Sequence, residues 1–75
     1  MCKTFDELET YLLGGGEVEF YYKDELYSIS HNAEGWYLSR CGNQEYQVFK
    51  GCENLLENAA IESKKLSEIW DEVRI

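Results

Sequence analysis

The chain has 75 residues, of which 15 are acidic and 7 are basic, so its formal net charge is −8. This charge is too negative to attract DNA, RNA or an anionic membrane surface. Its length predicts one domain, residues 1–75, which is too small to enclose a deep pocket. The hydrophobic fraction of 44% argues against disorder, and the aromatic fraction of 15% supplies large contact area for a small core.

The cysteines at positions 2, 41 and 52 are odd in number and have no CxxC spacing. Small secreted domains usually pair their cysteines, so we expect free thiols in a reducing compartment. The N-terminal segment becomes acidic at once, without the apolar run of a signal peptide, and no apolar stretch approaches the roughly 20 residues that span a bilayer. We therefore expect a cytoplasmic protein.

The first predicted element is a helix over residues 4–13. Thr4 followed three residues later by Glu7 forms a capping box, in which each side chain accepts from the backbone N–H of the other residue. The glycine run 14–16 ends this helix. Its apolar side chains recur at helical spacing, at Phe5, Leu8 and Leu12.

Residues 17–49 alternate with a period of two and contain no proline, which predicts strands of an antiparallel meander. The predicted turns are Asp24–Glu25, a four-residue loop 32–35 and a three-residue loop 42–44. A two-residue last turn would place Gln47 opposite Leu38 on the buried face, so the longer loop is preferred. The core face then consists of Val18, Phe20, Tyr22, Tyr27, Ile29, Trp36, Leu38, Tyr46 and Val48.

After Phe49 the apolar period becomes helical, with Gly51 and Ser63 as the N-caps of two successive helices. The apolar residues of the second of these helices are Leu66, Ile69, Trp70 and Val73. Together the elements predict an α+β fold, a four-stranded antiparallel β-meander with helices packed on one face, in the order α-β-β-β-β-α-α.

No residue pattern predicts catalysis, a cofactor or a metal. A zinc site needs converging N or S ligands, which His31 (expected at the rim of the core) and three scattered cysteines do not offer. Cys41 is expected near Glu45, a carboxylate that would raise its pKa. Cys52 lies in the first turn of a predicted helix, where the helix dipole could lower its pKa. We nevertheless favour an inert thiol at this position, and a thiol-dependent enzyme is the least favoured alternative. The glycine run 14–16 lacks the GK[ST] of a phosphate-binding loop.

The sheet face opposite the predicted core is the candidate binding surface. The rows of residues that lie side by side across its strands combine aromatic residues with small serines, and carboxylates lie at the margin. Aromatic residues are enriched at protein interfaces. The candidate binding residues are Glu17, Glu19, Tyr21, Tyr37, Glu45 and Phe49. If the first helix instead crosses over and covers this face, the binding surface moves to the acidic helices, chiefly to Glu57, Glu62, Glu68, Asp71 and Glu72.

The segments EVEFYYKDELYSIS, GWYLS and KKLSEIWDEV, as a set, resemble small acidic proteins common in low-GC Gram-positive bacteria and their prophages. The likeness covers residues 17–73 and contains no catalytic motif, so it implies a fold and an origin in mobile elements. In size and acidity the chain is similar to phage proteins that inhibit host nucleases, anti-CRISPR proteins included.

The leading functional hypothesis is a non-enzymatic protein-binding module, an inhibitor from a phage or mobile element. Its acidic surface would engage a host protein with a basic surface, such as a nucleic-acid-binding defence protein. The alternative is a structural or regulatory domain that forms a homodimer or larger homo-oligomer by burying Tyr21, Tyr37 and Phe49 against a copy of itself.

Overall fold

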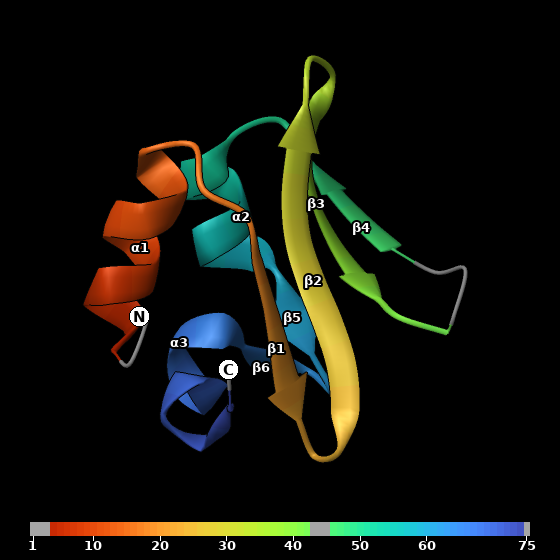
Figure 1. The fold of residues 1–75 in the computed structure, drawn as a ribbon. Coiled ribbons are helices and arrows are strands. Elements are labelled where there is room, and N and C mark those ends of the chain that lie inside the picture. The colour runs from red at the N-terminus through yellow and green to blue at the C-terminus, as the bar shows by residue number, and fades with distance from the viewer. Residues whose placement is uncertain (1–3, 43–45, 75) are drawn as a thin grey trace.

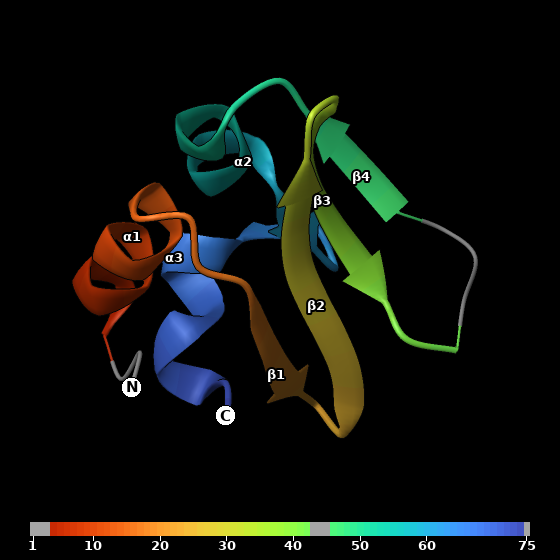
Figure 2. The same cartoon turned by 45° about the horizontal axis from the view of Figure 1, so that its top comes forward.

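The computed structural model describes residues 4–42 and 46–74. Four strands form an antiparallel sheet in the order β1-β2-β3-β4, and β5 and β6 form a separate hairpin. The helices lie together on one side of the sheet (Figure 1, Figure 2), so the predicted α+β class and element order are confirmed. The elements are α1 (Phe5–Leu13), β1 (Val18–Tyr22), β2 (Glu25–Asn32), β3 (Gly35–Arg40), β4 (Tyr46–Phe49), α2 (Cys52–Asn58), β5 (Ala60–Ile61), β6 (Lys64–Lys65), α3 (Leu66–Ile69) and the 3₁₀ turn η1 (Trp70–Glu72).

The start of α1 has the predicted capping box. The Glu7 N–H donates to Thr4 Oγ1 at 3.2 Å, and the Thr4 N–H donates to Glu7 Oε1 at 3.1 Å. Leu8 and Leu12 are fully buried, as their spacing requires. The helix ends where Gly15 adopts a φ of 92°, a left-handed conformation that glycine adopts without steric cost.

The hairpin of β1 and β2 turns one residue earlier than predicted. Lys23 and Asp24 occupy the two-residue turn with positive φ of 52° and 64°, so the prediction of Asp24–Glu25 was wrong. Phe20 consequently pairs with Tyr27, and their rings stack at 5.6 Å between centroids. Because the pairing moves by an even number of residues, every side chain keeps its predicted face.

The predicted register of β2 and β3 is confirmed. Ile29 pairs with Leu38 and His31 with Trp36, although the connecting turn is shorter than the predicted loop 32–35 because Asn32 pairs with Gly35. A glycine is required at position 35, since a Cβ there would lie 2.6 Å from the backbone oxygen of Phe49.

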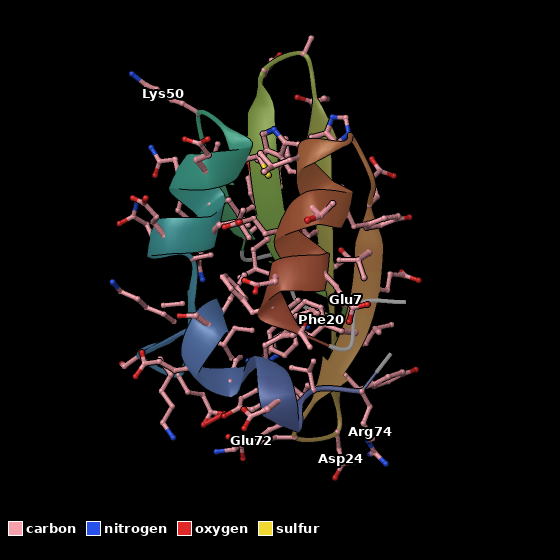
Figure 3. All side chains as sticks on the ribbon, turned by 90° about the vertical axis from the view of Figure 1, so that its left-hand side faces the viewer. Glu7, Phe20, Asp24, Lys50, Glu72 and Arg74 are labelled. Atoms are coloured by element: carbon pink, nitrogen blue, oxygen red, sulfur yellow. The ribbon has the colours of Figure 1, made fainter. Side chains whose placement is uncertain are left out.

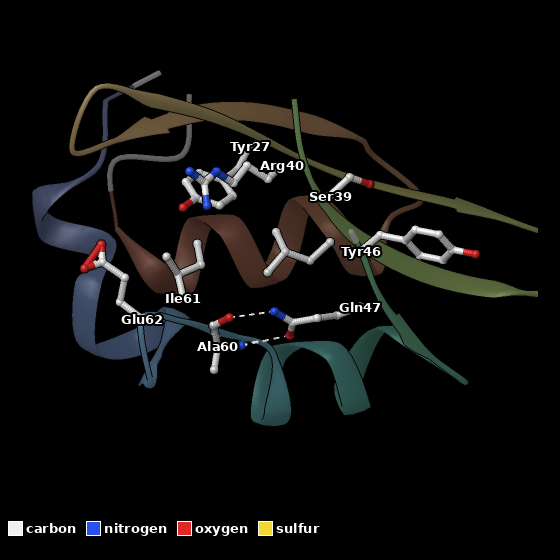
Figure 4. A pocket seen from close by; sticks show the side chains of 9 residues that line it. Tyr27, Ser39, Arg40, Tyr46, Gln47, Ala60, Ile61 and Glu62 are labelled. Atoms are coloured by element: carbon white, nitrogen blue, oxygen red, sulfur yellow. Dashed lines mark hydrogen bonds between the residues drawn. The ribbon is translucent and has the colours of Figure 1, made fainter. Parts of the chain in front are cut away.

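The predicted register of β3 and β4 is wrong by one residue. Leu38 pairs with Gln47, so Phe49 packs on the core while Tyr46 and Val48 are 60% and 55% exposed. Gln47 can face the core side of the sheet because its side-chain amide hydrogen-bonds to the backbone of Ala60 (Figure 4). Its Nε2 donates to the Ala60 oxygen at 2.6 Å, and its Oε1 accepts from the Ala60 N–H at 3.1 Å. Gln47 is half-buried, and a polar side chain tolerates such burial when it is hydrogen-bonded in this way.

The hairpin of β5 and β6 precedes α3 where the sequence predicted only a break. Glu62 and Ser63 form its turn with φ of 54° and 68°, so Ser63 is not the predicted N-cap. The last helical segment instead starts after Lys65, whose backbone N–H donates to Glu68 Oε1 at 2.9 Å. Beyond η1, Arg74 forms a bridge to Tyr21 of β1.

The core lies between the helices and one face of the sheet. Figure 3 looks onto the helix layer, with Phe20 behind it. Trp70 packs edge-on against Phe20 at 5.0 Å between ring centroids. The buried residues are Leu8, Leu12, Phe20, Tyr22, Tyr27, Ile29, Leu38, Cys52, Leu55, Leu56, Ala59, Ile61, Leu66, Ile69 and Trp70.

Candidate binding surface

The second face of the sheet, here called the open face, has no helix or strand of the described chain over it (Figure 1, Figure 2). α1 contributes Leu8 and Leu12 to the core on the opposite side, so the alternative in which this helix covers the open face is wrong. The strand registers place on the open face Glu19, Tyr21, Leu26, Ser28, Ser30, Tyr37, Ser39, Tyr46 and Val48.

Some of the predicted binding residues lie on this face and others do not. Glu19 is exposed and Tyr21 is 48% exposed, both on β1, while Tyr37 is half-buried on β3. Glu17 is exposed just before β1. Phe49 was assigned to this face wrongly, because the one-residue change of register turns it toward the core. Glu45 lies outside the described residues.

Tyr46 and Val48 were missed as binding candidates, and they form a hydrophobic cluster with Tyr37. The Tyr37 ring meets the Tyr46 ring edge-to-face at 5.9 Å between centroids, and Val48 pairs directly with Tyr37. The Tyr37 hydroxyl donates to Asn32 Oδ1 at 3.2 Å, which fixes the orientation of its ring. The change of register therefore leaves the aromatic character of the face intact.

A pocket of about 280 Å³ opens between the ends of β3 and β4 and the hairpin of β5 and β6 (Figure 4). Arg40 pairs with Glu25, and the Tyr27 hydroxyl donates to the same carboxylate at 3.4 Å. Burial, and then the negative charge of Glu25, raise the pKa of the Tyr27 phenol. The polar groups of Arg40 and Tyr27 at this pocket thus already contact the carboxylate of Glu25. The lining residues are Tyr27, Leu38, Ser39, Arg40, Tyr46, Gln47, Ala60, Ile61 and Glu62.

The candidate nucleophile and the only histidine are both engaged in the fold. Burial raises the pKa of the Cys52 thiol, and the nearby Glu53 and Glu9 act in the same direction, against the lowering that a helix dipole could produce. His31 Nε2 lies 3.0 Å from the Gly15 carbonyl oxygen, which can only accept, so this nitrogen carries the proton. The His31 ring also stacks on Trp36 at 4.4 Å between centroids.

The acidic residues named for the alternative interface, Glu57, Glu62, Glu68, Asp71 and Glu72, are all exposed away from the open face. Glu62 lies 3.4 Å from Lys23 and is the main cause that raises the pKa of that lysine. In the described ranges, no group of three His, Cys, Asp or Glu side chains converges as metal ligands. None of the described helices is long and apolar enough to cross a membrane.

Comparison with known proteins found no matching family model, no matching curated protein and no matching solved structure. The likeness to prophage proteins stays a prediction, and the functional argument depends on the geometry and charge of the chain itself.

Proposed function

We propose that this chain is a non-enzymatic protein-binding module whose open face contacts a protein partner with a basic surface. The observation that supports this most is the exposure of Tyr21, Tyr46 and Val48, at 48%, 60% and 55%, together on one uncovered face. The other large hydrophobic side chains exposed in the described residues are Tyr11 and Leu13, both on α1. Tyrosine combines apolar area with a polar hydroxyl group, which suits a surface that is wet when free and dry when bound.

The charge of the chain specifies the kind of partner. A net charge of −8, with Glu17 and Glu19 at the β1 side of the open face, attracts Lys- and Arg-rich surfaces and accelerates their encounter. Proteins that bind nucleic acid present such surfaces because they contact phosphates. The finer proposal is therefore an inhibitor that occupies the basic surface of a nucleic-acid-binding protein, and the resemblance to prophage proteins supports an origin in a phage or mobile element.

A matched pair of tyrosine variants tests the use of the open face. Tyr21 on the open face and Tyr11 on α1 are 48% and 49% exposed, so Tyr21→Ser and Tyr11→Ser remove the same group at the same exposure. Each variant serves as bait in a bacterial lysate, and quantitative mass spectrometry compares the captured proteins with those of the wild type. We expect a partner that Tyr11→Ser retains and Tyr21→Ser loses. A partner retained or lost equally by both variants would contradict the proposed surface.

Salt tests the electrostatic part of the proposal. Raising the ionic strength from about 0.1 M to about 1 M shortens the Debye length from about 10 Å to about 3 Å. We expect the captured partner to be released over this range and Glu19→Lys to weaken capture at low salt. Capture that is insensitive to both changes would refute a basic partner while leaving the aromatic face as a binding surface.

A further inference from the structure

The two edges of the four-stranded sheet differ. At the β1 edge, the Tyr21 N–H donates to the Arg74 oxygen at 2.7 Å, and the Arg74 N–H donates to the Tyr21 oxygen at 2.9 Å. At the β4 edge, no backbone or side-chain group of the described residues pairs with the outer side of Tyr46–Phe49. This strand also contains neither a proline nor a charged residue, which proteins commonly place on edge strands to prevent pairing.

The hydrogen-bonding phase of the sheet determines which backbone groups face outward on β4. The Cys41 N–H donates to the Leu26 oxygen at 2.9 Å, so alternate residues from Cys41 back along β3 bond to β2. Trp36 and Leu38 lie between them and bond toward β4, where their partners are Phe49 and Gln47. The backbone N–H and C=O groups of Tyr46 and Val48 therefore point away from the sheet.

We propose that the β4 edge pairs with the β4 edge of a second copy of this chain, in a symmetric antiparallel dimer that doubles the four-stranded sheet. In Figure 1 no helix or strand of residues 4–42 and 46–74 lies beyond β4 on the side away from β3. Only outward-facing residues exchange hydrogen bonds, and opposite residues must share a face. In the symmetric register that uses both outward-facing residues, Tyr46 of one copy lies opposite Val48 of the other, with Gln47 at the two-fold axis.

Three features of the strand favour a second copy as the occupant. The register is self-complementary, as a symmetric dimer requires, and it uses both outward-facing residues of β4. It places an aromatic residue opposite a β-branched one, a favourable cross-strand pair. Two copies with a charge of −8 repel each other overall. This repulsion is smallest at β4, because the strand has no charged residue and the residue after it is the basic Lys50. This inference uses the strand edge, so it stands or falls independently of the proposed function.

Sedimentation equilibrium of the full chain, from micromolar to millimolar concentration, tests the dimer. We expect the mass to rise from 8.8 kDa toward twice that value in the wild type and in Val48→Thr, which keeps the β-branched shape. Val48→Lys should stay at 8.8 kDa throughout, while the control Ser30→Lys, with the same charge on the same face but in β2, should dimerise. Thermal unfolding of each variant establishes that it is folded.

Amide hydrogen exchange tests the register. With rising concentration, exchange should slow at the Tyr46 and Val48 amides, whereas the Gln47 and Phe49 amides, already bonded to β3, should be slow at every concentration. A wild-type monomer over the whole range would overturn the proposal and leave the β4 edge to a strand of another protein. A dimer that survives Val48→Lys, or one without protection at Tyr46 and Val48, would also overturn it.

Discussion

Replacing Gln47 by leucine tests the contact that sets the position of β4. Gln47 is the side chain that joins β4 to β5, because its amide donates to and accepts from the backbone of Ala60. Leucine has a similar size and would be the obvious choice for a core-facing position, but it leaves the Ala60 N–H and C=O without these partners. The substitution therefore separates the value of the two hydrogen bonds from that of apolar burial.

The expected cost follows from the burial of the contact. A buried backbone group without a partner costs about 1–3 kcal/mol. Ala60 is half-buried, so water recovers part of this cost, and the leucine side chain adds apolar burial that offsets more of it. We expect a net loss of about 2 kcal/mol, which lowers the unfolding midpoint of a chain this size by about 10 °C.

Thermal and urea unfolding followed by circular dichroism measure this loss. Asn58→Ala is the control, because it removes another side-chain amide, which bonds to Asn54 at an exposed position, and should change stability by less than about 0.5 kcal/mol.

Gln47→Glu keeps the acceptor but loses the donor until its carboxyl is protonated. Facing the Ala60 oxygen, that carboxyl should have a pKa above the ordinary value of about 4.3, so its stabilisation is present at low pH and lost as the pH rises through that pKa. A Gln47→Leu chain as stable as the wild type would refute the reasoning.

Three further changes follow from the backbone and from titration. Gly35→Ala should destabilise by about 1–3 kcal/mol in urea unfolding, because the added Cβ would lie 2.6 Å from the Phe49 oxygen. Ser63→Gly should stabilise by about 0.5–1 kcal/mol in the same assay, because Ser63 has a φ of 68°. Raised pKa values of Cys52 and Tyr27, above their ordinary 9.0 and 10.0, make the unfolded chain lose these protons first. Stability is therefore complete at lower pH and falls above about pH 9, and urea unfolding as a function of pH should show a shallower fall in Cys52→Ala.

The sequence predicted the elements of this fold better than it predicted how the strands pair. The capping box at Thr4 and the helical spacing of Leu8 and Leu12 depend on residues close together in the chain, and both are confirmed. The turn of the first hairpin was misplaced, yet the faces of β1 and β2 were predicted correctly, because alternation determines a face and leaves the pairing open by steps of two.

The four residues of β4 show where local pattern reaches its limit. One alternation of this strand turns Tyr46 and Val48 to the core, and the other turns Gln47 and Phe49 to it. Each places one aromatic residue in the core, so hydrophobicity alone favours the pair that contains valine. The deciding partner, Ala60, lies 13 residues away in the sequence, on a two-residue strand too short to give a periodic signal. The same error placed Phe49 on the candidate surface and concealed Tyr46 and Val48, which the structure adds to it.

The confinement of the helices to one face of the sheet has an evolutionary consequence. Along each strand, neighbouring residues are under separate selection, since one stabilises the core and the next meets whatever binds outside. Positions such as Ser28, Ser39 and Tyr46 can therefore change with little penalty to folding, and a few substitutions there would redirect the proposed binding surface to a new target. A fold divided in this way suits a chain whose targets diversify faster than its own architecture.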